Sequence, residues 1–176
     1  MTVQTLRARL TREDIARLAD QRDPEARALA ARKVCARFAS GPLTEAERAT
    51  GAEIVRVLAE DAAELVRRAL SVTLQRSPHL PADVARALAA DIDSIALPII
   101  AGSPVLDDED LIAIVRGGDA RRQTAVAGRE AVSEAVVGEI VEVGAPEAVA
   151  AAAGNDGARF DARCYARTFE RFEGRA

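Results

Sequence analysis

The chain has 176 residues, of which 49% are hydrophobic and 30% are charged, and its net charge at pH 7 is −4. This length is typical of a single domain, and the hydrophobic fraction is too high for a disordered chain. Only 3% of the residues are aromatic and tryptophan is absent, which argues against a β-sandwich and against stacking of nucleobases on aromatic rings. The acidic balance also argues against non-specific attraction to nucleic acid or anionic lipid.

The composition favours helices, because the chain contains 39 alanines and 23 arginines but a single lysine. No run of 18 apolar residues is present, and the first residues do not resemble a secretion signal, so we expect a cytoplasmic protein without a membrane span. The two cysteines, Cys35 and Cys164, lie in helical apolar patterns. We expect two buried thiols in a reducing compartment, and a disulfide between them stays open as the alternative.

Helix start and stop signals predict an all-α fold. Thr44 and Glu47 have the spacing of a capping box, as do Asp61 and Glu64, and Asp23-Pro24 has the pattern of a cap followed by proline. Apolar residues recur at helical rather than alternating spacing throughout. The predicted helices cover 11–19, 23–39, 44–59, 61–76, 81–91, 93–101, 107–116, 119–128, 133–143, 146–153 and 158–172. Residues 1–10 are expected to form a flexible N-terminal arm.

The predicted helices repeat along the chain. A shift of about 26 residues places 93–102 over 119–128, and a second shift places 145–154 in the same register. Each repeat is a helix, a tight turn that usually carries aspartate, and a second helix; Ala145 replaces that aspartate in the last repeat. Because neither helix can bury its apolar stripe alone, successive pairs must stack on each other.

The sequences around Asp23 and Asp61, Asp-Pro-Glu-Ala-Arg-Ala-Leu and Asp-Ala-Ala-Glu-Leu-Val-Arg-Arg, resemble the start of the second helix of a HEAT repeat. Residues 20–155 also resemble an uncharacterised family of HEAT-like proteins, a domain of unknown function known mainly from alphaproteobacteria. The resemblance implies a right-handed α-α superhelix of about five helix pairs with a C-terminal capping helix, within one domain. It implies no activity.

Charge differs between the two rows of helices that such a stack would contain. The first helices of the pairs carry mostly Asp and Glu, whereas the second helices, expected to line the concave side, carry an excess of Arg. We therefore predict that the concave side binds an acidic partner segment. The candidate residues for this role are Arg32, Lys33, Arg68, Arg121 and Arg122. The alternative is that these side chains are solvated and that Asp–Arg pairs form within each repeat.

Four of the five aromatic residues lie close to the end of the sequence. They are Phe160, Tyr165, Phe169 and Phe172. The last three share one stripe of the helix predicted at 158–172, because they are spaced by four and three residues. We expect this helix to cap the end of the stack, with Phe160 and Phe169 packed against Val141 and Val149. In the alternative interpretation, the stripe binds a second copy of the chain or a partner.

The sequence predicts no catalytic, metal or cofactor site. Four consecutive acids, 107–110, suit the first turn of a helix, whose dipole favours negative charge. The one histidine, His79, lies between two prolines without a pattern typical of catalysis. Gly117-Gly118 is followed by Asp119 and no lysine, so it is not a phosphate-binding loop.

We therefore expect a non-enzymatic protein-interaction scaffold that acts as a monomer or a homodimer. The alternative in a different class is a nucleic-acid-binding solenoid that resembles the HEAT-like DNA glycosylases. Such a protein would need a basic groove and an aromatic residue near a catalytic aspartate, whereas the aromatic residues of this chain gather at one end. Salt-dependent retention on heparin or DNA would distinguish the two classes.

Overall fold

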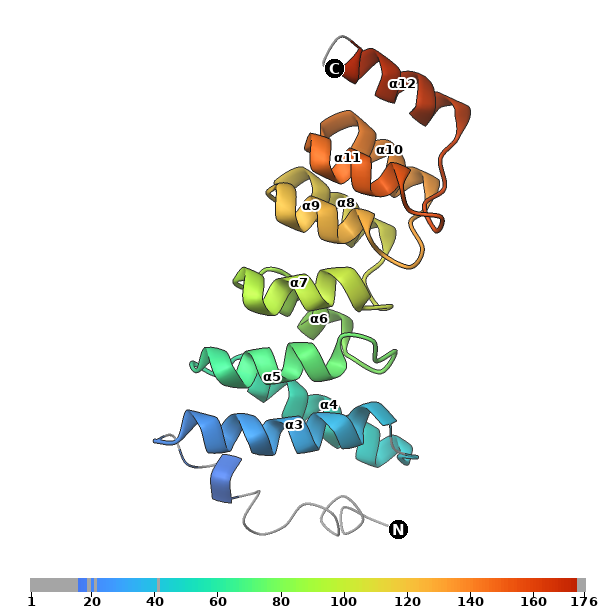
Figure 1. Ribbon diagram of the computed structural model, residues 1–176. Coiled ribbons are helices and arrows are strands. Elements are labelled where there is room, and N and C mark those ends of the chain that lie inside the picture. The colour runs from blue at the N-terminus through green and yellow to red at the C-terminus, as the bar shows by residue number, and fades with distance from the viewer. Residues whose placement is uncertain (1–15, 19, 21, 41, 174–176) are drawn as a thin grey trace. The chain divides into compact units, whose positions relative to one another are not determined.

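A computed structural model describes residues 16–18, 20, 22–40 and 42–173. The helices of eight or more residues in these ranges are labelled in Figure 1. They are α3 (Pro24–Ser40), α4 (Glu45–Ala59), α5 (Glu64–Leu74), α6 (Ala82–Ala89), α7 (Asp93–Gly102), α8 (Asp108–Gly117), α9 (Ala120–Ala127), α10 (Glu134–Val143), α11 (Pro146–Ala153) and α12 (Ala162–Phe172).

The all-α prediction is confirmed for the described residues, in which no strand occurs and the one β-bridge is isolated, between Val132 and Ala158. The predicted helix bounds agree with the structure to within a few residues. Of the helix expected at 11–19, residues 16–18 are described and are helical. The arm expected at 1–10 lies outside the described residues.

Local capping chemistry starts several helices where the sequence predicts. Thr44 and Glu47 form a reciprocal capping box at the start of α4, and Asp107 and Asp110 form the same box at the start of α8. In each box the cap side chain accepts a backbone N–H of the first turn, which has no partner within the helix. Ser133 caps α10 in the same way. The acidic run at 107–110 therefore has a structural role in starting a helix.

The prediction that Asp61 caps its helix is wrong. Helix α5 begins at Glu64, and its N-cap residue, Ala63, makes no side-chain cap. The Asp61 carboxylate instead accepts hydrogen bonds from the Arg27 guanidinium at 3.1 and 2.7 Å and from the Ala63 amide at 2.8 Å. A charged bidentate donor is a stronger partner than a first-turn amide, so Asp61 joins two helices rather than starting one.

The described chain forms two compact units. Unit 1 contains the described residues up to Ile99 together with Ser103–Val105, and unit 2 contains Ile100–Gly102 together with the described residues from Leu106 onward. That the whole chain is one domain stays a prediction.

In unit 1, α3 lies beside α5, while α4 packs against α3, α5 and α6 (Figure 1). The helices therefore alternate between two rows, as expected for paired repeats. Apolar side chains from all four helices are buried between the rows: Val34, Phe38, Val55, Leu58, Val66, Leu70, Leu74, Val84 and Leu88. Gly51 brings α4 close to α3, because a Cβ atom at this position would lie 2.6 Å from Cδ2 of Phe38.

Unit 2 has the same two-row order. Helix α9 packs against α11, α8 packs against α10, and α12 packs against α10. Its core contains the buried side chains of Leu111, Val115, Val126, Val136, Val137, Ile140, Val141 and Val149. The loop between α9 and α10 also contacts the loop between α11 and α12. The Val132 amide donates to the Gly157 carbonyl, and the Arg159 amide donates to the Val132 carbonyl, each at 3.0 Å.

Two arginines of unit 1 make the same contacts in successive repeats. Arg27 donates to the backbone carbonyl of Asp20 and to the carboxylate of Asp61. Arg67, at the equivalent place in α5, donates to the carbonyl of Asp61 and to the carboxylate of Asp91. We call this arrangement the Arg–Asp ladder. It joins successive helices of one row, whereas the alternative interpretation of the sequence had Asp–Arg pairs within each repeat.

In unit 2, a glutamine occupies the place of these arginines. Gln123 is the fourth residue of α9, as Arg27 and Arg67 are the fourth residues of α3 and α5. Its amide donates to the carbonyl of Val115 at 2.8 Å and accepts from the backbone amide of Ala145 at 2.7 Å. The last repeat therefore has Ala145 in place of the turn aspartate, and the uncharged Gln123 side chain bonds the backbone of this turn instead of a carboxylate.

Candidate functional site

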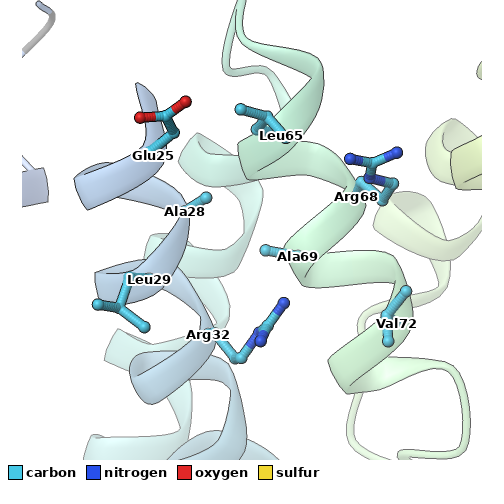
Figure 2. Close-up of a pocket in the computed structure, with 8 residues that line it drawn as sticks. All are labelled: Glu25, Ala28, Leu29, Arg32, Leu65, Arg68, Ala69 and Val72. Atoms are coloured by element: carbon cyan, nitrogen blue, oxygen red, sulfur yellow. The ribbon is translucent and has the colours of Figure 1, made fainter. Parts of the chain in front are cut away.

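A shallow groove of about 290 Å³ runs between α3 and α5, both in unit 1. We call it the α3/α5 groove, and it is lined by Glu25, Ala28, Leu29, Arg32, Leu65, Arg68, Ala69 and Val72. Figure 2 shows that the two helices run in the same direction along it, with Ala28 and Ala69 facing each other across the gap. Because both are alanines, the helices leave an open channel there instead of filling it with side chains.

Apolar side chains border this groove without being buried. Leu29 is 49% exposed, Leu65 is 36% exposed and Val72 is 48% exposed. Scattered exposed apolar residues are common on protein surfaces, but these three line one groove, Leu29 from α3 and Leu65 and Val72 from α5. They give the groove an apolar surface that a partner could cover.

The same groove contains two exposed guanidinium groups. Arg32 extends from α3 toward α5, and Arg68 lies on the opposite wall (Figure 2). Arg68 lies 3.9 Å from Glu64, a pair on the helix surface that contributes little to stability. Glu25 lies at the end of the groove away from Arg32. The groove therefore carries Glu25 and Arg68 toward one end and Arg32 toward the other.

The arginines of the Arg–Asp ladder differ from the arginines of the groove in exposure and in pairing. Arg27 is 4% exposed and Arg67 is 19% exposed at their side chains, and both are held by carboxylates. Burial is the largest influence on Asp61 and opposes its ionisation. The Arg27 and Ala63 hydrogen bonds and the neighbouring guanidinium charges outweigh it, so the pKa of Asp61 is lowered. These arginines stabilise the fold, whereas Arg32 and Arg68 face solvent.

The structure brings together two of the five residues predicted to bind a partner. Arg32 and Arg68 line the groove, and Lys33 is exposed on α3 but does not line it. Arg121 and Arg122 belong to α9 in unit 2. Their backbone amides donate to the N-cap side chain of Asp119. The structure therefore does not place these two arginines with the groove.

The C-terminal helix α12 uses its polar side to contact α10. Cys164 is its one buried residue, Arg167 pairs with Glu142 at 3.1 Å, and Arg171 donates to the carbonyls of Val141 and Gly144. The last carbonyls of a helix have no partner within that helix. The Arg171 guanidinium supplies donors to the end of α10, which explains why this side of α12 faces inward.

The aromatic stripe of α12 consequently points outward. Tyr165 is 56% exposed and Phe169 is 74% exposed. Phe160 is half-buried and lies 5.2 Å from the Tyr165 ring, and Phe172 is half-buried beneath the Arg171 guanidinium at 5.1 Å. The expected packing of Phe169 against the last repeat is therefore wrong. Side chains of unit 2 other than Phe169 bury Val141 and Val149.

Sequence reasoning missed the apolar residues of the groove, although a signal for them exists. Leu65, Arg68 and Val72 are spaced by three and four residues, so they share one side of α5. Leu29 and Arg32 share one side of α3 in the same way. That shared spacing is the signal by which these residues could have been grouped as one candidate surface.

Other reactive side chains do not form a site. Cys35 and Cys164 are free thiols and both are buried; burial raises the pKa of Cys35 to about 12. His79 is exposed in the turn before α6. Among the described residues, no group of three His, Cys, Asp or Glu could hold a metal ion. Within the same residues, every helix is too short or too polar to cross a membrane.

Comparison with known protein families matches part of the chain. Neither the curated proteins nor the solved structures contain a protein that matches the chain. Residues 95–176, somewhat less than half of the chain, match the model of a family described as an uncharacterised protein conserved in bacteria (DUF2336). The matched segment begins in α7 and includes α12, so it covers the unit with the outward aromatic stripe rather than the α3/α5 groove.

Proposed function

We propose that the chain is a non-enzymatic HEAT-like adaptor of the cytoplasm, in which the α3/α5 groove binds an acidic, amphipathic segment of a partner protein. The juxtaposition of Arg32 and Arg68 with three exposed apolar side chains in one groove carries this proposal. The repeated contacts of the Arg–Asp ladder support the HEAT-like repeat, because they recur at the same place in successive helices. The finer arrangement, a right-handed superhelix, is part of the proposal.

The chemistry of the groove specifies its occupant. Carboxylates of the partner pair with Arg32 and Arg68, while two or three leucine-like side chains cover Leu29, Leu65 and Val72. Glu25 repels carboxylates at its own end of the groove. The bound segment therefore places its carboxylates beside Arg32 and Arg68 and a neutral or basic residue beside Glu25.

Selection from a display library of random peptides tests this specificity directly. The full chain is immobilised and the retained peptides are sequenced. We expect enrichment of peptides that combine Asp or Glu with leucine or phenylalanine. Enrichment of basic peptides, or of none, would refute the proposal.

Charge reversal locates the binding surface. Arg32→Glu combined with Arg68→Glu should weaken binding of a selected peptide by at least about tenfold, mostly through slower association. Lys33→Glu is the matched control for the single reversal Arg32→Glu, because both replace one cation of α3 by glutamate, and the effect of Lys33→Glu should be several-fold smaller. Circular dichroism checks that each variant is folded. Equal loss in Lys33→Glu and Arg32→Glu would mean that the groove is not the binding surface.

A nucleic-acid partner would give a different result. Retention on heparin or duplex DNA that falls steeply with salt, and that is lost with the Arg32 and Arg68 reversals, would assign the groove to phosphate instead of carboxylate. We expect no retention at physiological salt.

A further inference from the structure

The exposed side of α12 has a feature that the proposed adaptor function does not use. Ala162, Tyr165, Ala166 and Phe169 follow one another at spacings of three, one and three residues and are all exposed. They form an apolar stripe on one side of α12. The opposite, polar side of the helix contacts α10 through Arg167 and Arg171. The Phe160 ring lies 5.2 Å from that of Tyr165, and Tyr165 and Phe169 nevertheless stay 56% and 74% exposed. We call it the α12 stripe.

We propose that two copies of the chain associate through the exposed sides of their α12 helices, packed antiparallel about a two-fold axis midway between Tyr165 and Phe169. In this register, Tyr165 lies opposite Phe169 of the second copy, and Ala162 lies opposite Phe172 of the second copy. Each contact then occurs twice, as an isologous interface requires. Tyr165 and Phe169 meet near the centre of the interface, and the small Ala162 meets the large Phe172 at each end.

The alanines of the stripe allow the two helices to approach closely. Helix axes pack 8 to 10 Å apart, and the shorter distances need small residues at the contact. Ala162 and Ala166 lie one turn apart on the exposed side, so they provide that space without cost to helix formation.

Charge complementarity favours a second copy over other occupants. Arg163 and Glu170 are exposed near opposite ends of the stripe, and in the antiparallel register Arg163 of one copy approaches Glu170 of the other. Glu170 also contacts Arg167 of its own helix at 3.2 Å and stays 66% exposed, so a second donor can reach it. A membrane surface is disfavoured, because Arg167 and Arg171 on the polar side of α12 are engaged by α10, and Glu170 and Glu173 border the stripe.

Sedimentation velocity of the full chain, from about 1 to 200 µM, tests the association. The interface is a single helix pair, smaller than a standard protein–protein interface, so we expect a dimer that forms reversibly across this range. Phe169→Arg should weaken dimer formation by at least about tenfold while leaving the melting temperature of the monomer unchanged, because this side chain is exposed. A chain that stays monomeric at 200 µM, or a Phe169→Arg variant that dimerises as before, overturns the proposal.

A charge exchange tests the antiparallel register. Arg163→Glu and Glu170→Arg should each weaken the dimer several-fold, and the variant that combines them should recover most of the loss, because the exchanged charges meet again across the axis. Glu147→Arg on α11 is the control and should have no effect. If the combined variant is weaker than either single variant, the register is wrong. If the chain instead sediments with anionic vesicles through Phe169, the stripe binds lipid and the dimer proposal fails.

Discussion

Replacement of Arg27 by methionine tests whether the Arg–Asp ladder stabilises unit 1. The Arg27 side chain is 4% exposed and donates two hydrogen bonds to Asp61 and one to the carbonyl of Asp20. Methionine keeps the apolar part of the arginine side chain but removes its hydrogen-bond donors. The Asp61 carboxylate, whose side chain is 13% exposed, then loses the Arg27 hydrogen bonds and keeps the one from the Ala63 amide. Removal of one partner from a buried pair costs roughly 3–5 kcal/mol, and we expect about 3 kcal/mol because Asp61 reaches some water.

Urea unfolding followed by circular dichroism at 222 nm measures this loss. Arg32→Met is the matched control, because the same substitution on the same helix removes an exposed side chain and should cost less than about 0.5 kcal/mol. Asp61→Asn combined with Arg27→Met completes a double-mutant cycle, in which we expect a coupling free energy of about 1–3 kcal/mol. If Arg27→Met costs no more than Arg32→Met, the ladder does not stabilise the unit.

The same pair predicts a pH dependence with a definite sign. The pKa of Asp61 is lowered in the folded chain, so its ionised form contributes stability that is fully present above the unfolded pKa of about 3.9. This contribution disappears as the pH falls through the folded pKa. The difference in unfolding free energy between the native chain and Arg27→Met should therefore be constant from about pH 5 to 7 and shrink below about pH 4. A difference that grows on acidification would contradict the assignment.

Three further predictions concern packing and reactivity. Gly51→Ala should destabilise the chain by about 1–3 kcal/mol, because the new methyl group would meet the buried Phe38 ring, whereas Gly138→Ala in open space should stabilise it by about 0.5–1 kcal/mol; thermal melts compare the two. Gln123→Ala should cost about 2–3 kcal/mol in urea unfolding, because it leaves a buried carbonyl and a backbone amide without partners. Cys35 should not react with a disulfide reagent at pH 8 until urea unfolds the chain, because burial raises its pKa to about 12; rapid labelling of the native chain would show that its environment is open.

Helix positions could be predicted from the sequence because their signals are local. The Thr44–Glu47 and Asp107–Asp110 boxes each join residues three positions apart, so the sequence alone contains both partners. The alternation of two helix rows also follows from the sequence, since paired amphipathic helices must stack to bury their apolar sides.

Which charges are structural could not be predicted in the same way. Asp61 has the spacing of a cap but pairs with Arg27, 34 residues away, and the identical residue types of Arg67 and Arg68 separate into a ladder arginine and a groove arginine. A rotation of 100° per residue around α5 is enough to bury one and expose the other. That assignment depends on the neighbouring helix, which no local pattern specifies.

The orientation of α12 is the clearest example of a feature that tertiary contacts determine. The sequence determined that this helix has an aromatic stripe, and the usual rule that apolar residues face the core predicted that Phe169 would be buried. The structure instead directs Arg171 to the carbonyls that end α10, because unpaired carbonyls there need donors, and the stripe of Tyr165 and Phe169 turns to solvent. An amphipathic sequence thus determines that a helix has two different sides, while the hydrogen-bonding needs of its neighbour determine which side faces inward.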